Sequence, residues 1–437
     1  MKKVTVIGAG LAGSEAAYQL AKRGIQVKLY EMKPKKYTEV HQNENFAELV
    51  CSNSFGADRL GNASGMMKEE MRRLDSLLMK IADETKVPAG QALAVDRESF
   101  AKKVTEELQK MENVEIINEE LKKIPRDEYV IVATGPLSSD SISEDIKELL
   151  GENYLYFYDA VAPILTFESI DKDKVYFASR YDKGEGEYIN CPMNKEQYDN
   201  FYNELLNAES IPLKKFEQEK LFEACMPVEK IAGRGEKTLL FGPLKPKGLV
   251  NPRTEEEDYA VIQLRQDDTA GSLYNMVGFQ TNLKWGEQKR VFSMIPGLEN
   301  AEFVRYGVMH RNTFINSTKL LNKDLSLKMN NKIHFAGQIT GSEGYMCAIA
   351  TGCMAAINVY NKINGLEEFV LDSRSSTGAI INYITEPRKK FQPMGPNFGI
   401  MDKLDERVRD KRERYERIAK KGLEYFDEKI KEMEINK

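Results

Sequence analysis

The chain has 437 residues, of which 41% are hydrophobic and 30% charged, and its formal net charge is -5. This composition is typical of a globular protein long enough for two domains. The negative charge argues against nonspecific nucleic-acid binding through overall electrostatics. No apolar run is long enough to span a membrane, and the chain begins on a strand without a signal sequence, so we expect a cytoplasmic protein without membrane contact.

The cysteines and histidines do not form the usual metal-binding patterns. Five cysteines are scattered along the chain without C-x-x-C spacing, and only three histidines are present. We therefore expect no bound metal and no disulfide framework, and any reactive cysteine should act as a single thiol. A lone cysteine is more often a small buried hydrophobic residue than a nucleophile. The five are Cys51, Cys191, Cys225, Cys347 and Cys353.

The N-terminal stretch carries the pattern of a dinucleotide-binding unit. Residues 4–23 comprise a short apolar strand, a G-x-G-x-x-G turn at Gly8, Gly10 and Gly13, and a helix with small apolar residues at helical spacing. A second strand follows and ends at Glu31. The number of residues between the glycine turn and Glu31 is close to the spacing that this dinucleotide fingerprint requires.

Each residue type has its own part in holding an ADP-containing dinucleotide, either FAD or NAD. Gly8 permits the tight turn, Gly10 lets the backbone approach the pyrophosphate, and Gly13 lets the helix pack closely on the strand. Free N–H groups at the helix start bind the diphosphate, and the carboxylate of Glu31 holds the ribose hydroxyls. The residues that we expect to contact the cofactor here are Gly8, Ala9, Gly10, Leu11, Ala12, Gly13 and Glu31.

The next predicted elements follow from apolar spacing. Residues 66–85 are predicted to form one long amphipathic helix. Asp96 is placed to cap a helix over residues 99–111, and residues 114–117 read as a strand.

Two further apolar strands end in small residues that suit the same cofactor. Residues 129–135 end in Ala-Thr-Gly, as is common where a flavoprotein sheet passes under the dinucleotide. Residues 333–338 form a second fingerprint, in which Gln338 replaces the acid that holds the ribityl chain and can still hydrogen-bond an alcohol. Two fingerprints favour FAD over NAD. They add Gly135, Gly337 and Gln338 to the expected contacts.

Between the two fingerprints the sequence changes to a mixed pattern rich in aromatic residues. We therefore predict an α/β fold, in which a Rossmann-type FAD-binding domain is built from both chain ends, residues 1–159 and 301–437. An inserted α+β domain is predicted at residues 160–300. Trp285 and the aromatic run at residues 154–158 are expected to lie in the core and not to act as stacking platforms.

The C-terminal part is locally basic. Residues 385–421 hold twelve Lys or Arg against seven Asp or Glu. Such a segment could meet phosphates, or it could be a solvated helix with internal i,i+4 ion pairs. Charge alone favours neither.

A set of short stretches in matching order resembles the folate- and FAD-dependent tRNA (uracil-5-)-methyltransferases. The resemblance runs from the first strand to Phe398 and is more specific than any one motif. It includes Cys51-Ser-Asn-Ser54 and Cys225-Met-Pro227. The matching stretches are residues 6–24, 47–54, 68–72, 87–90, 94–97, 154–159, 225–227, 263–267, 277–281, 305–314 and 391–398.

This resemblance implies formation of 5-methyluridine in the T-loop of tRNA. The carbon would come from 5,10-methylenetetrahydrofolate, and NADH or NADPH would reduce the FAD. Cys225 matches the family's nucleophile, whose thiolate adds to uracil C6 so that C5 becomes nucleophilic, and Cys51 matches the second functional cysteine, which removes the C5 proton. A base inside a folded loop must be extruded, so the basic residues 33–36 and 385–421 are expected to hold phosphates.

Other functions stay open at this point. Departures from the family pattern at residues 55–59 and 346–349 leave a uridine of 23S ribosomal RNA as an alternative target. An NAD(P)H-dependent flavin oxidoreductase acting on a small molecule, with Cys51 and Cys225 structural, is a second alternative. A noncatalytic FAD-containing RNA-binding protein is a third. The related wobble-uridine-modifying enzymes are longer than this chain, and the oligomeric state is open.

Overall fold

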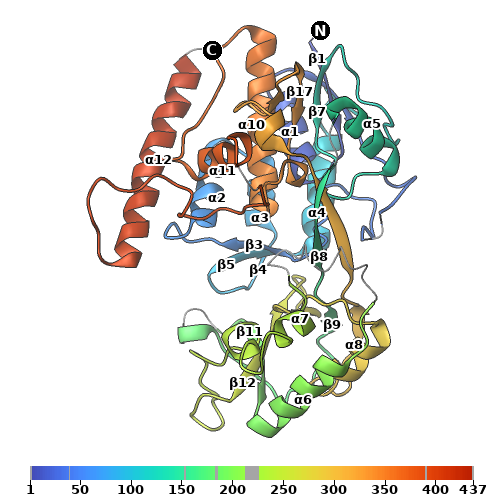
Figure 1. The fold of residues 1–437 in the computed structure, drawn as a ribbon, viewed down its shortest axis with the longest axis vertical. Helices are drawn as coiled ribbons and strands as arrows, with labels where there is room; N and C mark the ends of the chain where they lie inside the picture. Colours follow the sequence, from blue (N-terminus) through green and yellow to red (C-terminus); the bar gives the residue numbers. More distant parts are fainter. Residues whose placement is uncertain are drawn as a thin grey trace.

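The computed structural model describes residues 2–38, 40–151, 154–182, 186–211, 226–388 and 391–435. Figure 1 shows two bodies, a larger upper one that holds both chain ends and a smaller lower one formed by the middle of the chain. Among the described residues, no helix combines the length and the apolar character needed to cross a membrane.

The centre of the upper body is a six-stranded sheet. In spatial order it consists of β16 (Ser326–Leu327), β17 (Asn330–Phe335), β7 (Tyr129–Val132), β1 (Lys3–Ile7), β2 (Gln26–Tyr30) and β6 (Val114–Ile117). The neighbours from β17 to β6 run parallel, so strands from both ends of the chain share one sheet. This is the Rossmann-type α/β arrangement, and the predicted fold class is confirmed.

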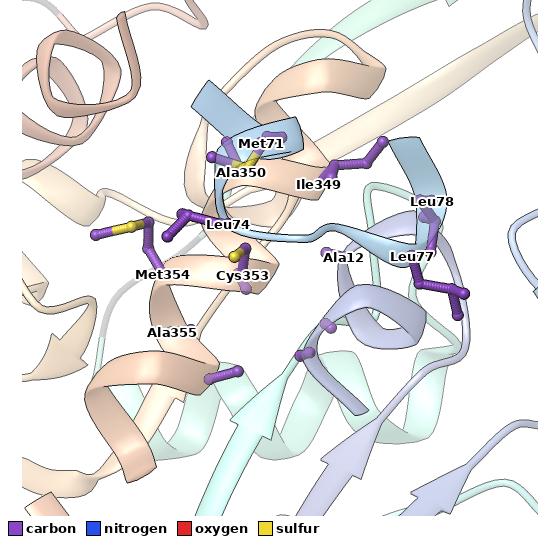
Figure 2. Close-up of a cluster of buried hydrophobic side chains, with 14 of the residues drawn as sticks. Ala12, Met71, Leu74, Leu77, Leu78, Ile349, Ala350, Cys353, Met354 and Ala355 are labelled. Carbon is purple, nitrogen blue, oxygen red and sulfur yellow. The ribbon is translucent and has the colours of Figure 1, made fainter. Parts of the chain in front are cut away.

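Helices cover both faces of this sheet. On one face, α1 (Leu11–Ala21) and α10 (Tyr345–Asn364) share a core cluster with the sheet, and on the other α5 (Asp140–Leu150) packs in a second cluster. Figure 2 shows Ala12 of α1 beside the α10 residues Ile349, Ala350 and Cys353. The two helices approach so closely that a Cβ atom on Gly352 would lie 2.2 Å from the carbonyl oxygen of Ala12.

The long helix predicted for residues 66–85 is wrong, because the chain breaks in its middle. Two helices form instead, α2 (Ala63–Arg73) and α3 (Leu77–Glu84). Asp75 between them has a φ of 54°, a left-handed conformation that a helix interior does not allow, and the Ser76 side chain caps α3. Leu74 and Leu77, on either side of this turn, are both buried in the same hydrophobic core and are labelled in Figure 2.

Other local predictions are confirmed. The Asp96 side chain accepts the N–H of Ser99 at 2.9 Å and so caps α4 (Arg97–Gln109). A small sheet of β3 (Ser54–Ala57), β5 (Ala92–Val95) and β4 (Lys86–Val87) lies at the lower edge of the upper body (Figure 1).

The lower body is built on an antiparallel six-stranded sheet. In order it consists of β10 (Tyr176–Phe177), β11 (Tyr188–Met193), β12 (Ala260–Gln266), β13 (Leu273–Met276), β9 (Ile164–Thr166) and β14 (Phe303–Arg305). Its helices α6 (Lys195–Asn207), α7 (Val228–Ala232) and α8 (Trp285–Phe292) pack on a separate core. The predicted domain boundaries at residues 159/160 and 300/301 stay a prediction.

The two chain crossings between the bodies lie side by side. They form an antiparallel ribbon of β8 (Leu155–Ala160) and β15 (Met309–Phe314), which Figure 1 shows running from one body to the other. The C-terminal part adds α9 (Ser317–Leu320), α11 (Ser376–Thr385) and α12 (Lys411–Ile435). The described residues also form the short 3-10 helices η1 (Arg180–Asp182), η4 (Leu239–Phe241) and η5 (Gln338–Thr340).

Candidate functional site

A cavity opens at the carboxyl ends of the parallel strands, beside the start of α1. Such an edge is where α/β sheets bind ligands. Among the predicted contacts, Gly13 alone is not on its wall, because it serves packing: a Cβ there would lie 1.8 Å from the carbonyl oxygen of Gly8. The predicted residues on the wall are Gly8, Ala9, Gly10, Leu11, Ala12, Glu31, Gly135, Gly337 and Gln338.

The carboxylate of Glu31 is fixed in this wall. Its two oxygens accept the backbone N–H groups of Ala9 and Lys33, each at 3.0 Å. A carboxylate has about four acceptor positions, so lone pairs remain for ribose hydroxyls. The geometry suits the role that the fingerprint assigns to Glu31.

The rest of the wall fits FAD as well. A Cβ on Gly10 would meet nothing within 4 Å, so the backbone at the α1 N-terminus is open to a pyrophosphate. Gln338 donates from Nε2 to Glu343 at 2.7 Å, which orients its amide and leaves the amide oxygen for an alcohol. Both fingerprints therefore meet at one cavity.

The basic loop at residues 33–36 does not offer free phosphate contacts. Lys33 is buried, and its Nζ donates to the carbonyl oxygen of Asn45 at 2.5 Å. Lys35 and Lys36 pair with Glu119 and Glu120, both at 2.9 Å. Nearby carboxylates and carbonyls thus already pair with these lysines, and the expectation that this loop holds RNA phosphates stays a prediction.

The Cys51 loop reaches the same cavity through Tyr345. The Tyr345 hydroxyl oxygen accepts the backbone N–H groups of Cys51 at 3.0 Å and Ser52 at 2.9 Å, and Tyr345 also lines the cavity. Burial raises the pKa of Tyr345, and the nearby Cys51 raises it further, so the hydroxyl stays neutral. The half-buried Cys51 thiol points toward the carbonyl oxygen of Ala160, at 3.8 Å.

Residues of the lower body hold this loop from the other side. The Asn53 amide nitrogen donates to the carbonyl oxygens of Val95 and Gln266, and Asn53 Oδ1 accepts from Arg265 Nε at 3.1 Å. A second Arg265 nitrogen donates to Ser52 Oγ at 2.8 Å. The loop thus joins the two bodies, with its polar groups satisfied.

Three arginines surround the loop, and sequence reasoning had not assigned them a role. Arg97 pairs with Asp267 at 2.9 Å, and Arg265 bonds the loop itself. Arg305 is half-buried and makes no hydrogen bond or ion pair with any described side chain. Burial and the charge of Arg97 both lower the pKa of Arg305, and the charges of Glu48 and Asp267 partly oppose this shift.

The remaining cysteines divide into two groups. Cys191, Cys347 and Cys353 are buried, and burial raises the pKa of each thiol, which fits a structural role. Cys225 lies outside the described residues, as does the His310 side chain. The described chain resumes at Met226.

Trp285 is not a core residue, contrary to the sequence expectation. Its side chain is 60% exposed at the start of α8. One face stacks on Tyr306, with ring centroids 5.7 Å apart and an angle of 14° between the planes. The Tyr306 ring in turn stacks on Phe303 at 5.5 Å.

The basic C-terminal segment contains several internal ion pairs. On α12, Arg412 pairs with Glu416 and Arg417 with Glu413, both at i,i+4 spacing. Lys421 pairs with Asp405 at 2.7 Å. These pairs engage three cations of the segment, whereas Lys403, Arg407, Arg409, Lys411 and Lys420 form no ion pair with a described residue, so contact with phosphates stays a prediction.

Comparison with known proteins places the chain in a family. A family model described as glucose inhibited division protein A matches residues 3–367. The methylenetetrahydrofolate–tRNA-(uracil-5-)-methyltransferase TrmFO of Fusobacterium nucleatum is 66% identical over 430 residues, which cover 98% of this chain and 99% of that protein. The chain belongs to the folate- and FAD-dependent tRNA (uracil-5-)-methyltransferase family. The resemblance drawn from the short stretches is confirmed.

Two further comparisons agree with this membership. The protein of the same name from Anoxybacillus flavithermus is 57% identical over 432 residues, covering 99% of this chain and all of that protein. The crystal structure of Aquifex aeolicus GidA superposes with a TM-score of 0.67 at 18% identity, over 99% of this chain and 76% of that chain. That likeness shows a shared fold for this methyltransferase family member.

Proposed function

We propose that this chain makes 5-methyluridine in the T-loop of tRNA, taking the carbon from 5,10-methylenetetrahydrofolate and using FAD reduced by NADH or NADPH. Its high identity to proteins named for this reaction supports the proposal. The structural observation that carries it is the double hydrogen bond from the Cys51 loop to Tyr345, because it ties a thiol to the wall of the FAD cavity.

FAD fits the cavity described above. Glu31 would hold the adenosine ribose, the open backbone at Gly10 and the α1 N-terminus the diphosphate, and Gln338 the ribityl chain. When bound, reduced FAD supplies the reducing equivalents that turn a methylene unit into a methyl group.

The chain's own residues carry out the chemistry on the base. The Cys225 thiolate adds to uracil C6, which places an enolate over C4 and C5, and C5 then bonds to the methylene carbon. Cys51 takes the proton from C5 as the methylene carbon separates from the nitrogen that carried it, and after this carbon has received a hydride the bond between Cys225 and C6 breaks and the ring regains its double bond. Tyr345 fixes the backbone of Cys51 and so positions its thiol for this proton.

Arg305 is the residue best placed to meet an anion beside Cys51. It forms no ion pair with a described residue, although the carboxylates of Glu48 and Asp267 act on it electrostatically. A phosphate of the extruded nucleotide or the enolate oxygen of the uracil would satisfy it. The division into residues 1–159 and 301–437 around an inserted 160–300 domain is part of the proposal, as is a cytoplasmic location, where tRNA is modified.

The test compares cysteine variants on two RNAs. Wild type, Cys225→Ala, Cys51→Ala and the control Cys191→Ala receive methylenetetrahydrofolate, NADPH, and either unmodified tRNA or a 23S ribosomal RNA fragment. Wild type and the control should yield 5-methyluridine in the tRNA, whereas the Cys225 and Cys51 variants should keep FAD and lose the product. Product in the ribosomal fragment alone would change the target.

An oxidoreductase gives a different result. NADPH oxidation that is unchanged in both variants, with neither RNA methylated by wild type, would refute the proposal. Binding of RNA without methylation by any donor would indicate the noncatalytic alternative.

A further inference from the structure

The Trp285 ring closes a stack of three aromatic side chains that runs from the lower core to the surface. Phe303, at the inner end, packs against the hydrophobic core of the lower body. Tyr306 lies in the middle and stacks on both neighbours, at angles of 24° and 14°. Trp285, at the outer end, is 60% exposed, and a Cβ on the adjacent Gly286 would meet nothing within 4 Å.

The exposure of this indole has an energetic cost unless something covers it. A tryptophan side chain can bury a large apolar area, and a further ring can stack face to face on the three aromatic rings already present. The supporting rings hold the indole plane fixed, so a further planar ring could add to the stack without ordering a side chain first. The free face has the size and flatness that a nucleobase needs.

The stack is connected to the Cys51 site through the backbone. Gln288 of α8 clamps Gly307, donating to its carbonyl oxygen at 2.9 Å and accepting its N–H at 2.8 Å. The next residue, Val308, accepts the N–H of Val161 at 2.8 Å. Ala160, directly before Val161, provides the carbonyl oxygen nearest to the Cys51 thiol.

A cation in the chain segment that carries two of the stacked rings is near the Cys51 site, because Arg97 and Tyr345 act on it electrostatically. Arg305 directly precedes Tyr306, is half-buried and has no ion-pair partner among the described residues. An exposed aromatic face can stack a base, and a half-buried guanidinium near the Cys51 loop can take a phosphate, so together they suit neighbouring nucleotides of one RNA strand. A single protein side chain would not offer both a planar ring for the indole and an anion for the guanidinium.

We propose that Trp285 is a stacking platform for a base of the substrate RNA, next to the uridine that reacts. This inference rests on the proposed function, because RNA is the only substrate in that reaction with several bases. A base stacked on Trp285 would be kept out of the RNA's own base stack, and this would hold the loop open toward Cys51.

Trp285 is the single tryptophan of the chain, so its fluorescence reports on this site alone. The holoenzyme is titrated with an unmodified T-arm RNA hairpin while tryptophan emission is recorded. We expect quenching on binding. The Trp285→Ala variant should bind the hairpin roughly 5- to 150-fold more weakly and raise KM for the RNA by a similar factor, with a smaller effect on kcat and with FAD retained, while Trp285→Phe should restore most of the affinity.

The matched control is Phe241→Ala. Phe241 is the most exposed of the large hydrophobic side chains, at 82%, and it stacks on no described ring. Its loss should leave RNA affinity unchanged. An equal loss in both alanine variants, an unquenched tryptophan, or quenching by methylenetetrahydrofolate alone with no further change on RNA addition would each overturn the platform.

The titration does not depend on turnover, so the two proposals fail separately. A wild-type enzyme that methylates tRNA while Trp285→Ala keeps a normal KM for RNA overturns the platform and leaves the function. A wild-type enzyme that quenches on RNA but makes no 5-methyluridine overturns the function and supports base stacking at Trp285.

Discussion

The Tyr345 hydroxyl accepts the backbone N–H of Cys51 at 3.0 Å, although 294 positions separate the two residues in the chain. The same oxygen accepts the N–H of Ser52. Tyr345 begins α10, the helix that packs on the glycine-rich start of α1, while Cys51 begins a loop held from the lower body by Arg265 and Asn53. One phenol therefore links the cofactor cavity to the loop that carries the thiol.

Replacing this phenol should impair catalysis more than folding. Tyr345→Phe keeps the ring and leaves two backbone N–H groups without their acceptor, so we expect kcat for methylation to fall roughly ten-fold, since such a loss is worth about 1–3 kcal/mol. FAD content and KM for RNA should change little. The control is Tyr360→Phe on the same helix, whose hydroxyl makes no hydrogen bond with a described residue. An unchanged kcat in Tyr345→Phe would show that the loop does not need this bond.

The carboxylate of Glu31 should determine FAD affinity. In Glu31→Gln an amide N–H would face either Ala9 N–H or Lys33 N–H, so we expect FAD to dissociate roughly ten- to a hundred-fold more readily. The measurement is the Kd for FAD from reconstitution of the apoprotein, followed by flavin fluorescence. Glu115→Gln, at an exposed position on β6, is the control. Equal FAD affinity in wild type and Glu31→Gln would remove Glu31 from the site.

The contact between α1 and α10 should tolerate no side chain at its centre. Gly352→Ala places a methyl group against the Ala12 carbonyl, and we expect it to lower the free energy of unfolding by about 1–3 kcal/mol. FAD retention should fall too, because Ala12 lines the cavity. Gly233→Ala is the control, since its Cβ would meet backbone oxygens at an ordinary 3.6 Å. Urea denaturation of both variants checks the difference, and a fully stable Gly352→Ala would contradict the packing.

A buried charge cluster should make stability fall in acid. Asp324 lies 2.5 Å from Lys362 Nζ and 3.7 Å from His334 Nε2. Burial holds the pKa of His334 below its ordinary 6.5. Burial opposes the charged form of Asp324, but the contacts with His334 and Lys362 outweigh it and lower the pKa of the carboxyl.

Both shifts act in the same direction. The unfolded chain takes up the His334 proton first, so stability falls as pH drops below 6.5, and the depressed carboxyl of Asp324 adds to the loss at lower pH. His334→Gln should remove part of this dependence, at most about 2 kcal/mol between neutral pH and about pH 5. Urea titrations at several pH values test it. A variant with the same pH slope as wild type would show that His334 does not titrate on unfolding.

The local parts of the fold and of the FAD cavity could be predicted from sequence because neighbouring residues encode them. Gly8, Gly10 and Glu31 lie within one strand-turn-helix-strand unit, and the structure brings them to one cavity with Gly337 and Gln338. The break at Asp75 escaped prediction because apolar spacing continues across it. A turn with a positive φ and a capping serine leaves that spacing almost intact.

Features that depend on tertiary contacts could not be predicted from the sequence. Arg97, Arg265 and Arg305 lie far apart in sequence and meet only because both bodies close on the Cys51 loop. The residues next to Arg305 in the sequence do not indicate that it lacks an ion-pair partner among the described residues. The sequence predicts Trp285 in the core, whereas its exposure depends on how α8 meets the segment that carries Tyr306.

The most direct test of the account follows the carbon atom. The purified wild-type protein is given unmodified tRNA, NADPH and methylenetetrahydrofolate that carries an isotopic label on the methylene carbon, and the tRNA is digested to nucleosides for mass spectrometry. We expect labelled 5-methyluridine from the T-loop. NADPH oxidation with bound FAD, and no label in any nucleoside, would contradict it.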